Sequence, residues 1–148
     1  MKQPCIIAEE VQVRPALDAC CLVRIPRFTD ERGSLSAVEG PPVLPFQPRR
    51  LYYLYELPVD AHRGCHAHRT EQEVIVALAG SFKVCVNNGI ESKEYELASP
   101  DEGLYLPPLI WHDVFGFSPD TVCAVFASEL YNPGDYFLKY EDYLQAFK

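Results

Sequence analysis

The sequence lacks the patterns of several large protein classes. No apolar run approaches the roughly 18 residues that a membrane-spanning helix needs, and the longest one near the N-terminus, residues 5–8, is too short for a signal peptide. The Gly-x-Gly-x-x-Gly and P-loop patterns of nucleotide-binding loops are also missing. We therefore expect no membrane-spanning segment, no secretory signal and no redox cofactor.

Basic residues are scarce relative to acidic ones. The chain has 13 Lys and Arg against 21 Asp and Glu, a formal net charge of −8. Nonspecific binding to nucleic acid and docking on an anionic membrane both depend on a basic surface. We therefore expect neither nucleic acid nor a membrane as a partner.

Paired cysteine motifs are absent as well. The six cysteines form no Cys-x-x-Cys pair and no zinc-module spacing, and two of them are adjacent: Cys5, Cys20, Cys21, Cys65, Cys85 and Cys123. This usage is typical of reduced, small apolar side chains in a cytoplasmic protein, which is where we expect the chain.

What the sequence does have is many short strand patterns. Its 148 residues suit one domain spanning residues 1–148, and 13 Pro with 8 Gly do not suit a helical bundle. Apolar or alternating runs predict strands at 51–55, 73–79, 81–86, 94–97, 103–106 and 121–127. The run at 87–89, Asn-Asn-Gly, predicts a tight turn between two of them.

Only the C-terminus predicts a helix. Aromatic and apolar residues recur at helical spacing from Tyr136 to Phe147, and Asp135 precedes them as a candidate N-cap. Many short strands followed by one amphipathic helix predict an all-β fold, a jelly roll or β-sandwich barrel with the helix packed outside.

Three of the four histidines form a pattern typical of a shared site. His66 and His68 are two residues apart on a predicted strand, so their side chains point to the same face. Glu73 follows five residues after His68, and His112 lies on a later strand. The spacing is close to the two-part motif of the cupins, which are small jelly-roll barrels, although Asp60 and Leu109 replace two of the glycines in that motif. Imidazoles and a carboxylate from neighbouring strands suit either a divalent metal or metal-free acid–base chemistry.

The segment from residue 30 to residue 143 resembles the cupin-type sugar-nucleotide 3,4-ketoisomerases, which act on a dTDP-4-keto-6-deoxyhexose. The resemblance rests on six short motifs in order, at 30–35 (DERGSL), 50–53 (RLYY), 63–68 (RGCHAH), 103–105 (GLY), 111–112 (WH) and 127–136 (ASE through DY). One position departs from the family, which usually has Gln where this chain has Glu73.

The resemblance implies an isomerase that moves the sugar carbonyl from C4 to C3 through an enediolate, without metal or other cofactor. The implied substrate is a dTDP-linked 4-keto-6-deoxy sugar, and a homodimer is implied in the same way. The chemistry needs a base that works near neutral pH, a second proton carrier and donors for the enediolate oxygens, and histidine suits the first of these tasks.

The resemblance also suggests roles for individual residues. His66 is the expected base at C3, and His68 is expected to orient it or relay protons. Tyr52 or Tyr53 is expected to handle the other proton, and only one of them can face the barrel because alternate strand residues point opposite ways. The candidate substrate-binding residues are Arg32, Arg50 and Arg63 for the diphosphate and His112 for the sugar pocket.

Two other functions remain open at this point. A metal-dependent cupin enzyme, a dioxygenase or an isomerase, would use His66, His68, Glu73 and His112 as ligands. A non-catalytic nucleotide-sugar binding protein would use the same barrel and bind its ligand without exchanging the C3 proton.

Overall fold

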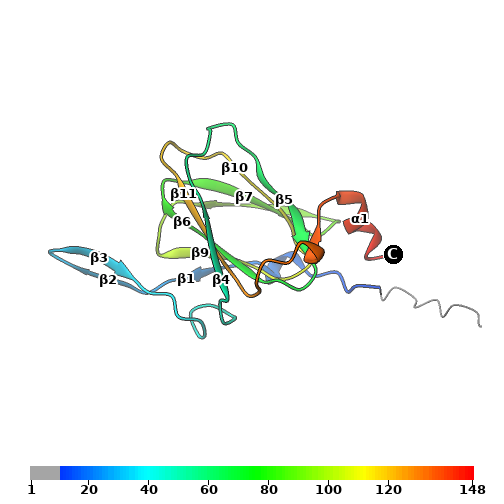
Figure 1. The fold of residues 1–148 in the computed structure, drawn as a ribbon, viewed down its shortest axis with the longest axis horizontal. Coiled ribbons are helices and arrows are strands. Elements are labelled where there is room, and N and C mark those ends of the chain that lie inside the picture. Colours follow the sequence, from blue (N-terminus) through cyan, green and yellow to red (C-terminus); the bar gives the residue numbers. More distant parts are fainter. Residues whose placement is uncertain (1–10) are drawn as a thin grey trace, which may run out of the picture.

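Two antiparallel five-stranded sheets pack face to face in the computed structural model, which describes residues 11–148 (Figure 1). The segment 1–10, with Cys5 and the short apolar run, lies outside the described residues. One sheet has the order β1-β9-β6-β11-β4 and the other β12-β5-β10-β7-β8. The strands of the first sheet are β1 (Cys21–Arg24), β4 (Arg50–Leu54), β6 (Glu73–Ala79), β9 (Glu102–Leu106) and β11 (Val122–Ala127). Those of the second are β5 (Arg63–His68), β7 (Phe82–Asn87), β8 (Ser92–Leu97), β10 (Trp111–Phe115) and β12 (Tyr136–Phe137).

The alternation in the sequence explains how these strands pack. In β7 the side chains of Phe82, Val84 and Val86 are fully buried between the sheets, whereas Lys83 is exposed. β6 reads as a continuous apolar run because it is a central strand, covered on both faces along most of its length. The predicted all-β sandwich and the strands expected from residue 51 onward are therefore confirmed. The first three strands, β1, β2 (Arg27–Asp30) and β3 (Gly33–Ser36), were not predicted, because most of their residues are exposed.

The C-terminal helix is shorter than the sequence suggests. Residues 133–135 form a 3-10 turn, β12 pairs with β5, and the helix α1 spans only Tyr140–Gln145. The prediction that Asp135 caps this helix is wrong, because the N-cap position is Lys139 and has no side-chain cap hydrogen bond. Pairing of β12 with β5 takes up the residues between Asp135 and the helix.

One hairpin stands away from the two sheets. β2 and β3 pair only with each other and project from the sandwich at the end opposite α1 (Figure 1). Phe28 and Leu35 lie opposite each other in this hairpin and are 65% and 61% exposed. We call residues 27–36 the arm.

No helix within residues 11–148 is long and apolar enough to cross a membrane.

Candidate active site

The two sheets bring the predicted histidines and Glu73 together inside the sandwich. β5 carries His66 and His68, and His112 on the adjacent strand β10 lies in register with His66. Glu73 begins β6 in the facing sheet, and its side chain is buried. The His66 ring stands edge-on to those of His68 and His112, at centroid distances of 4.8 and 4.7 Å. The side chains that the sequence predicts to share a site therefore lie together between the sheets.

The backbones of β5 and β10, the two strands that carry the histidines, approach each other closely at Gly64. The β5–β10 ladder shifts register after His112, and at this shift Gly64 and Cys65 have φ angles of 77° and 57°. A Cβ atom at Gly64 would lie 2.9 Å from the carbonyl oxygen of His112. Only glycine fits such a position without moving the neighbouring strand.

Glu73 is the anionic centre of the cluster. The Tyr52 hydroxyl donates a 2.8 Å hydrogen bond to Oε1, which is also 3.2 Å from His68 Nε2. Oε2 is 3.5 Å from His112 Nε2 and has no hydrogen-bond partner among the described residues. Burial alone would raise the pKa of Glu73, but the hydrogen bond with His68, the charges of both histidines and the Tyr52 hydroxyl lower it below its ordinary value. The carboxylate is therefore charged at neutral pH.

His66 is set up as a neutral base. Its Nδ1 lies 2.9 Å from the Gly64 carbonyl oxygen, which can only accept, so Nδ1 carries the proton and Nε2 keeps a lone pair. Burial, followed by the neighbouring His112 and His68, lowers the pKa of His66 to about 4. The free Nε2 points at His68 Nε2, 3.2 Å away.

His68 has the opposite electrostatics. Burial opposes its protonation, but the hydrogen bond and charge of Glu73, together with Glu71 and Asp135, raise its pKa above the ordinary value. Three carboxylates surround the ring: Glu73 and Glu71 lie 3.2 and 3.6 Å from Nε2, and Asp135 lies 3.6 Å from Nδ1. His68 is therefore the imidazole of the pair that binds a proton more readily, beside the lone pair of His66.

Sequence reasoning missed Glu71 and misassigned Asp135. Glu71 is 2% exposed and binds Arg50 through two hydrogen bonds of 3.1 and 3.2 Å. Burial raises the pKa of Glu71 to about 7, with the Glu73 carboxylate adding to the effect and His68 and Arg50 opposing it. The available signal was an acidic residue three positions after His68 and two positions before a buried strand.

The other predicted residues divide between the interior and the surface. Tyr52 points into the cluster, whereas Tyr53 points away and is 58% exposed, as the alternation of side chains on a strand requires. Arg63 is exposed at the start of β5 and, with Tyr52, His66 and His112, lines a hollow of about 70 Å³ between the sheets. Arg32 lies in the arm, where its side chain pairs with Asp30 at 2.6 Å and contacts none of the histidines.

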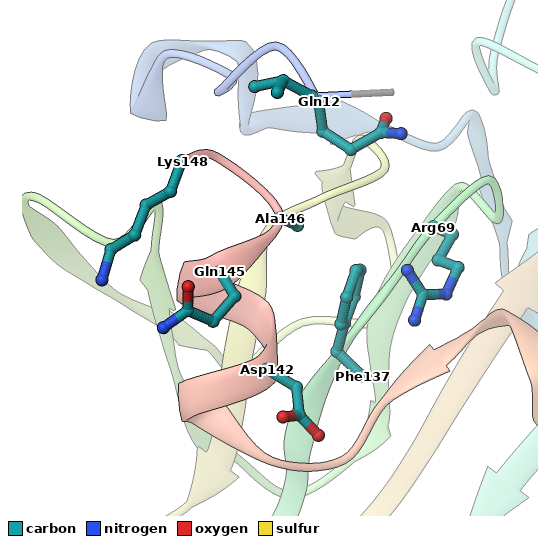
Figure 2. Close-up of a pocket in the computed structure, with 8 residues that line it drawn as sticks. Gln12, Arg69, Phe137, Asp142, Gln145, Ala146 and Lys148 are labelled. Carbon is teal, nitrogen blue, oxygen red and sulfur yellow. The ribbon is translucent and has the colours of Figure 1, made fainter. Parts of the chain in front are cut away.

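A larger cavity, about 490 Å³, lies outside the sandwich (Figure 2). It is bounded by α1, the end of β12 and residues 11–12, and Arg69 lies in it with its guanidinium 3.7 Å from the ring centre of Phe137. Ala67 and Arg69 alternate with the inward-facing histidines of β5, so this cavity is on the far side of the strand. It contains no histidine, and the chemistry of the cluster locates the candidate site between the sheets instead.

The cluster also has the composition of a metal site. His66, His68 and Glu73 offer donor atoms that lie within 4.8 Å of one another. Imidazole and carboxylate donors suit a divalent first-row ion. Geometry alone therefore leaves the metal-dependent function as a second candidate.

Comparison with known proteins identifies relatives over most of the chain. The family profile described as FdtA, "WxcM-like, C-terminal", matches residues 18–148. The TDP-4-oxo-6-deoxy-α-D-glucose-3,4-oxoisomerase of Aneurinibacillus thermoaerophilus is 37% identical over 122 residues, which cover 82% of this chain and 88% of that protein.

Solved structures agree with this match. The sugar 3,4-ketoisomerase QdtA from Thermoanaerobacterium thermosaccharolyticum, in complex with TDP, is 35% identical with a TM-score of 0.85, covering 88% of this chain and 95% of that one. The TDP-quinovose 3,4-ketoisomerase WlaRB from Campylobacter jejuni is 30% identical with a TM-score of 0.83, covering 87% and 99%. The chain therefore belongs to the FdtA family, whose relatives described above are sugar-nucleotide 3,4-ketoisomerases.

Proposed function

We propose that the chain is an isomerase that moves the carbonyl of a dTDP-4-keto-6-deoxyhexose from C4 to C3. The observation that carries the proposal is the pair of unlike histidines in a buried site: Nε2 of His66, whose pKa is lowered, lies 3.2 Å from Nε2 of His68, whose pKa is raised. The family relationship supports the same reaction, and QdtA has also been solved, as a histidine-to-asparagine mutant, in complex with TDP-4-keto-6-deoxyglucose.

The reaction is a pair of proton transfers. His66 Nε2 removes the hydrogen from C3, and the electrons of that bond form the C3=C4 double bond and place negative charge on O4. A proton is then added to carbon C4, O3 gives up its hydroxyl proton, and O4 gains one. The product has its carbonyl at C3, and no electron leaves the substrate, so the chemistry needs no redox partner.

The remaining residues of the cluster stabilise charge in this scheme. His68 gives its own proton to C4 and then takes the C3 proton from His66 in its place, which restores both imidazoles. Burial beside Glu73 raises the pKa of Tyr52 far above its ordinary value, so the phenol keeps its proton and acts as a donor to a developing oxyanion. We assign the other proton-handling role predicted for the two tyrosines to Tyr52 and not to Tyr53.

Arg63, His112 and Arg50 are proposed to hold the substrate within one subunit. Arg63, at the mouth of the hollow, is proposed for the diphosphate, and His112 for the wall of the sugar pocket. Arg50 is already held by Glu71 and by the carbonyl oxygen of Glu129 at 3.0 Å. Glu71 therefore competes with a phosphate for Arg50.

Proton exchange at carbon tests the function. The protein is incubated with dTDP-4-keto-6-deoxyglucose in D2O, and the product is analysed by NMR. We expect a C3 carbonyl in place of the C4 carbonyl. Recovery of unchanged substrate, with binding but no loss of the C3 hydrogen, would instead indicate the non-catalytic binding protein.

The metal-dependent alternative makes a different prediction. His66, His68 and Glu73 would hold the ion, which would polarise a substrate carbonyl as a Lewis acid. Activity that disappears on chelation and returns with a divalent ion would favour it.

A homodimer is proposed as the working assembly. The support is the arm, whose apolar side chains Phe28 and Leu35 are exposed, since exposed apolar patches commonly mark interaction surfaces. In this proposal, Arg32 reaches a substrate only in the site of the partner subunit. Light scattering of the protein and of a Phe28→Ser/Leu35→Ser variant tests it: the variant is expected to be monomeric, and a monomeric unmodified protein would contradict the proposal.

We propose the cytoplasm as the compartment. The support is chemical: Cys20, Cys21, Cys65, Cys85 and Cys123 are free thiols, two of them exposed. Localisation of a tagged chain in its native cell is the test, and a periplasmic or secreted product would contradict it.

A further inference from the structure

One nitrogen of His68 faces a single carboxylate. His68 Nδ1 is buried and has no hydrogen-bond partner among residues 11–148, and Asp135 Oδ2 is 3.6 Å away. The ring itself is only 3% exposed, so water has little access to this nitrogen. Hydrogen bonds at catalytic groups are often long in ligand-free proteins and shorten in the substrate complex.

The carboxylate of Asp135 is held in place by neighbouring residues. Oδ1 accepts hydrogen bonds from the Thr70 amide at 3.0 Å and the Thr70 hydroxyl at 2.7 Å, and Oδ2 accepts one from the Glu71 amide at 3.1 Å. The pairing of β12 with β5 places the next residue, Tyr136, opposite His68. Asp135 is therefore aimed at the imidazole by the fold and by three donors.

We infer that Asp135 is a positioning residue for His68: its carboxylate holds the Nδ1 proton and thereby directs Nε2 toward His66. A carboxylate can only accept, so the nitrogen facing it must carry the hydrogen. The inference rests on the proposed function, because it assigns His68 Nε2 as the atom that passes protons to and from His66.

The other groups that face His68 lie on the opposite side of its ring or above it. Glu73 and Glu71 lie near Nε2, His66 Nε2 is also there, and the Tyr136 ring packs on the imidazole at a centroid distance of 4.4 Å. None of these groups is hydrogen-bonded to Nδ1. Asp135 is thus the residue that decides the state of that nitrogen.

Nitrogen-15 NMR of the ligand-free protein tests the contact without any assay of activity. The chain is labelled at its four histidines, and the ring resonances of His68 are assigned with a His68→Gln variant. In the unmodified protein Nδ1 of His68 is expected to be protonated at neutral pH. In Asp135→Asn the carboxylate that faces Nδ1 is lost, so a change in both ring resonances of His68 is expected.

Two variants separate this role from a structural one. Thr70→Val removes one hydrogen bond to Asp135 and keeps the carboxylate, so the His68 resonances are expected to stay as they are. Asp135→Glu restores a carboxylate, and partial recovery of the Nδ1 signal is expected. In turnover, Asp135→Asn is expected to lower kcat about 10²-fold with little change in KM, the size of a lost acid–base contribution.

The outcomes are distinct. An unprotonated Nδ1 in the unmodified protein, or His68 resonances that do not respond to Asp135→Asn in a folded variant, would overturn the inference. Should Asp135→Asn fail to fold, the protonation of Nδ1 in the unmodified protein decides alone. An unmodified protein without isomerase activity would overturn the proposed function, whereas the NMR result would still report whether Asp135 holds His68.

Discussion

His66 and His68 are chemically identical side chains two residues apart, yet their surroundings shift their pKa values in opposite directions. A backbone carbonyl and neighbouring imidazoles surround His66, whereas three carboxylates surround His68. Pairs of titratable groups whose pKa values are pushed apart commonly divide the roles of base and acid. The pair therefore supplies both halves of a proton transfer without a cofactor.

Replacing the base tests this division. His66→Asn keeps much of the shape of the side chain and removes the basic nitrogen, so the variant is expected to fold and bind dTDP. Its kcat is expected to fall by about 10²-fold or more. The measurement is the rate of loss of the C3 hydrogen, and a variant that removes it at the native rate would move the role of base to His68.

The pH profile gives a second test at the same residue. Activity requires neutral His66, so it is lost as pH falls through the pKa of that group, which burial lowers to about 4. The acid limb of kcat/KM is therefore expected to lie well below the ordinary histidine pKa of about 6.5. An acid limb centred near pH 6.5 would show that another group, or a more exposed His66, controls the reaction.

The two adjacent tyrosines form a matched pair of variants. Tyr52→Phe removes the hydroxyl that donates to Glu73, whereas Tyr53→Phe removes an exposed one. We expect Tyr52→Phe to lower kcat by roughly 10-fold or more, since removing one donor to an oxyanion typically costs that or more. Tyr53→Phe is expected to match the unmodified protein, and equal effects of the two substitutions would contradict the assignment.

At the scale of elements, the close approach of β5 and β10 sets the spacing of the histidines. Gly64→Ala would place a Cβ atom 2.9 Å from the His112 carbonyl oxygen at a φ of 77°. We expect a loss of about 1–3 kcal/mol in the free energy of unfolding, together with reduced kcat as the strands move apart. Thermal and denaturant unfolding give the first quantity, and turnover the second.

A second glycine provides the control. Gly116 also has a left-handed φ, of 68°, but the nearest atom to an added Cβ is 3.7 Å away, in the Lys83 side chain. Gly116→Ala therefore carries the backbone cost without the steric one. A loss of stability in Gly116→Ala as large as in Gly64→Ala would mean that the approach to His112 is not what requires glycine.

Strand positions were predictable where local pattern and burial agree. β6 and β7 follow from runs and alternation, whereas the strand of His66 and His68, and their shared orientation, were expected from the spacing of the two histidines. The arm was not predictable, because its residues are mostly exposed and give no alternation. The end of the chain was misread because β12 pairs with β5, a contact 68 residues away in the sequence that local helical spacing does not report.

The residues of the candidate site divide in the same way, into those that local spacing predicts and those that tertiary contacts bring in. Spacing and resemblance are enough to predict four inner members of the cluster, His66, His68, Glu73 and His112, and to expect one of Tyr52 and Tyr53 there; the structure selects Tyr52. Glu71 and Asp135 join the cluster through the turn after β5 and through the β12–β5 pairing. Their positions depend on tertiary register, which a single sequence does not show.

At the scale of the whole molecule, the reaction is expected to need nothing besides the protein and its substrate. Because the transfers move only protons and the electrons stay in the sugar, exhaustive dialysis against EDTA is expected to leave kcat unchanged. Elemental analysis of the dialysed protein is the companion measurement, with substoichiometric metal expected. Activity that is abolished by chelation and restored by a divalent ion would make His66, His68 and Glu73 a metal centre.

The hydrogen bond that fixes His66 comes from the main chain, at Gly64, and this has a consequence for how the protein tolerates mutation. A carbonyl is present whatever residue occupies the position, so no point substitution deletes the acceptor itself. The acid half of the pair depends instead on side chains, among them Asp135 and Glu71, which a single nucleotide change can remove. In a saturation mutagenesis screen, single substitutions should therefore impair proton donation by His68 more often than they change the tautomer of His66.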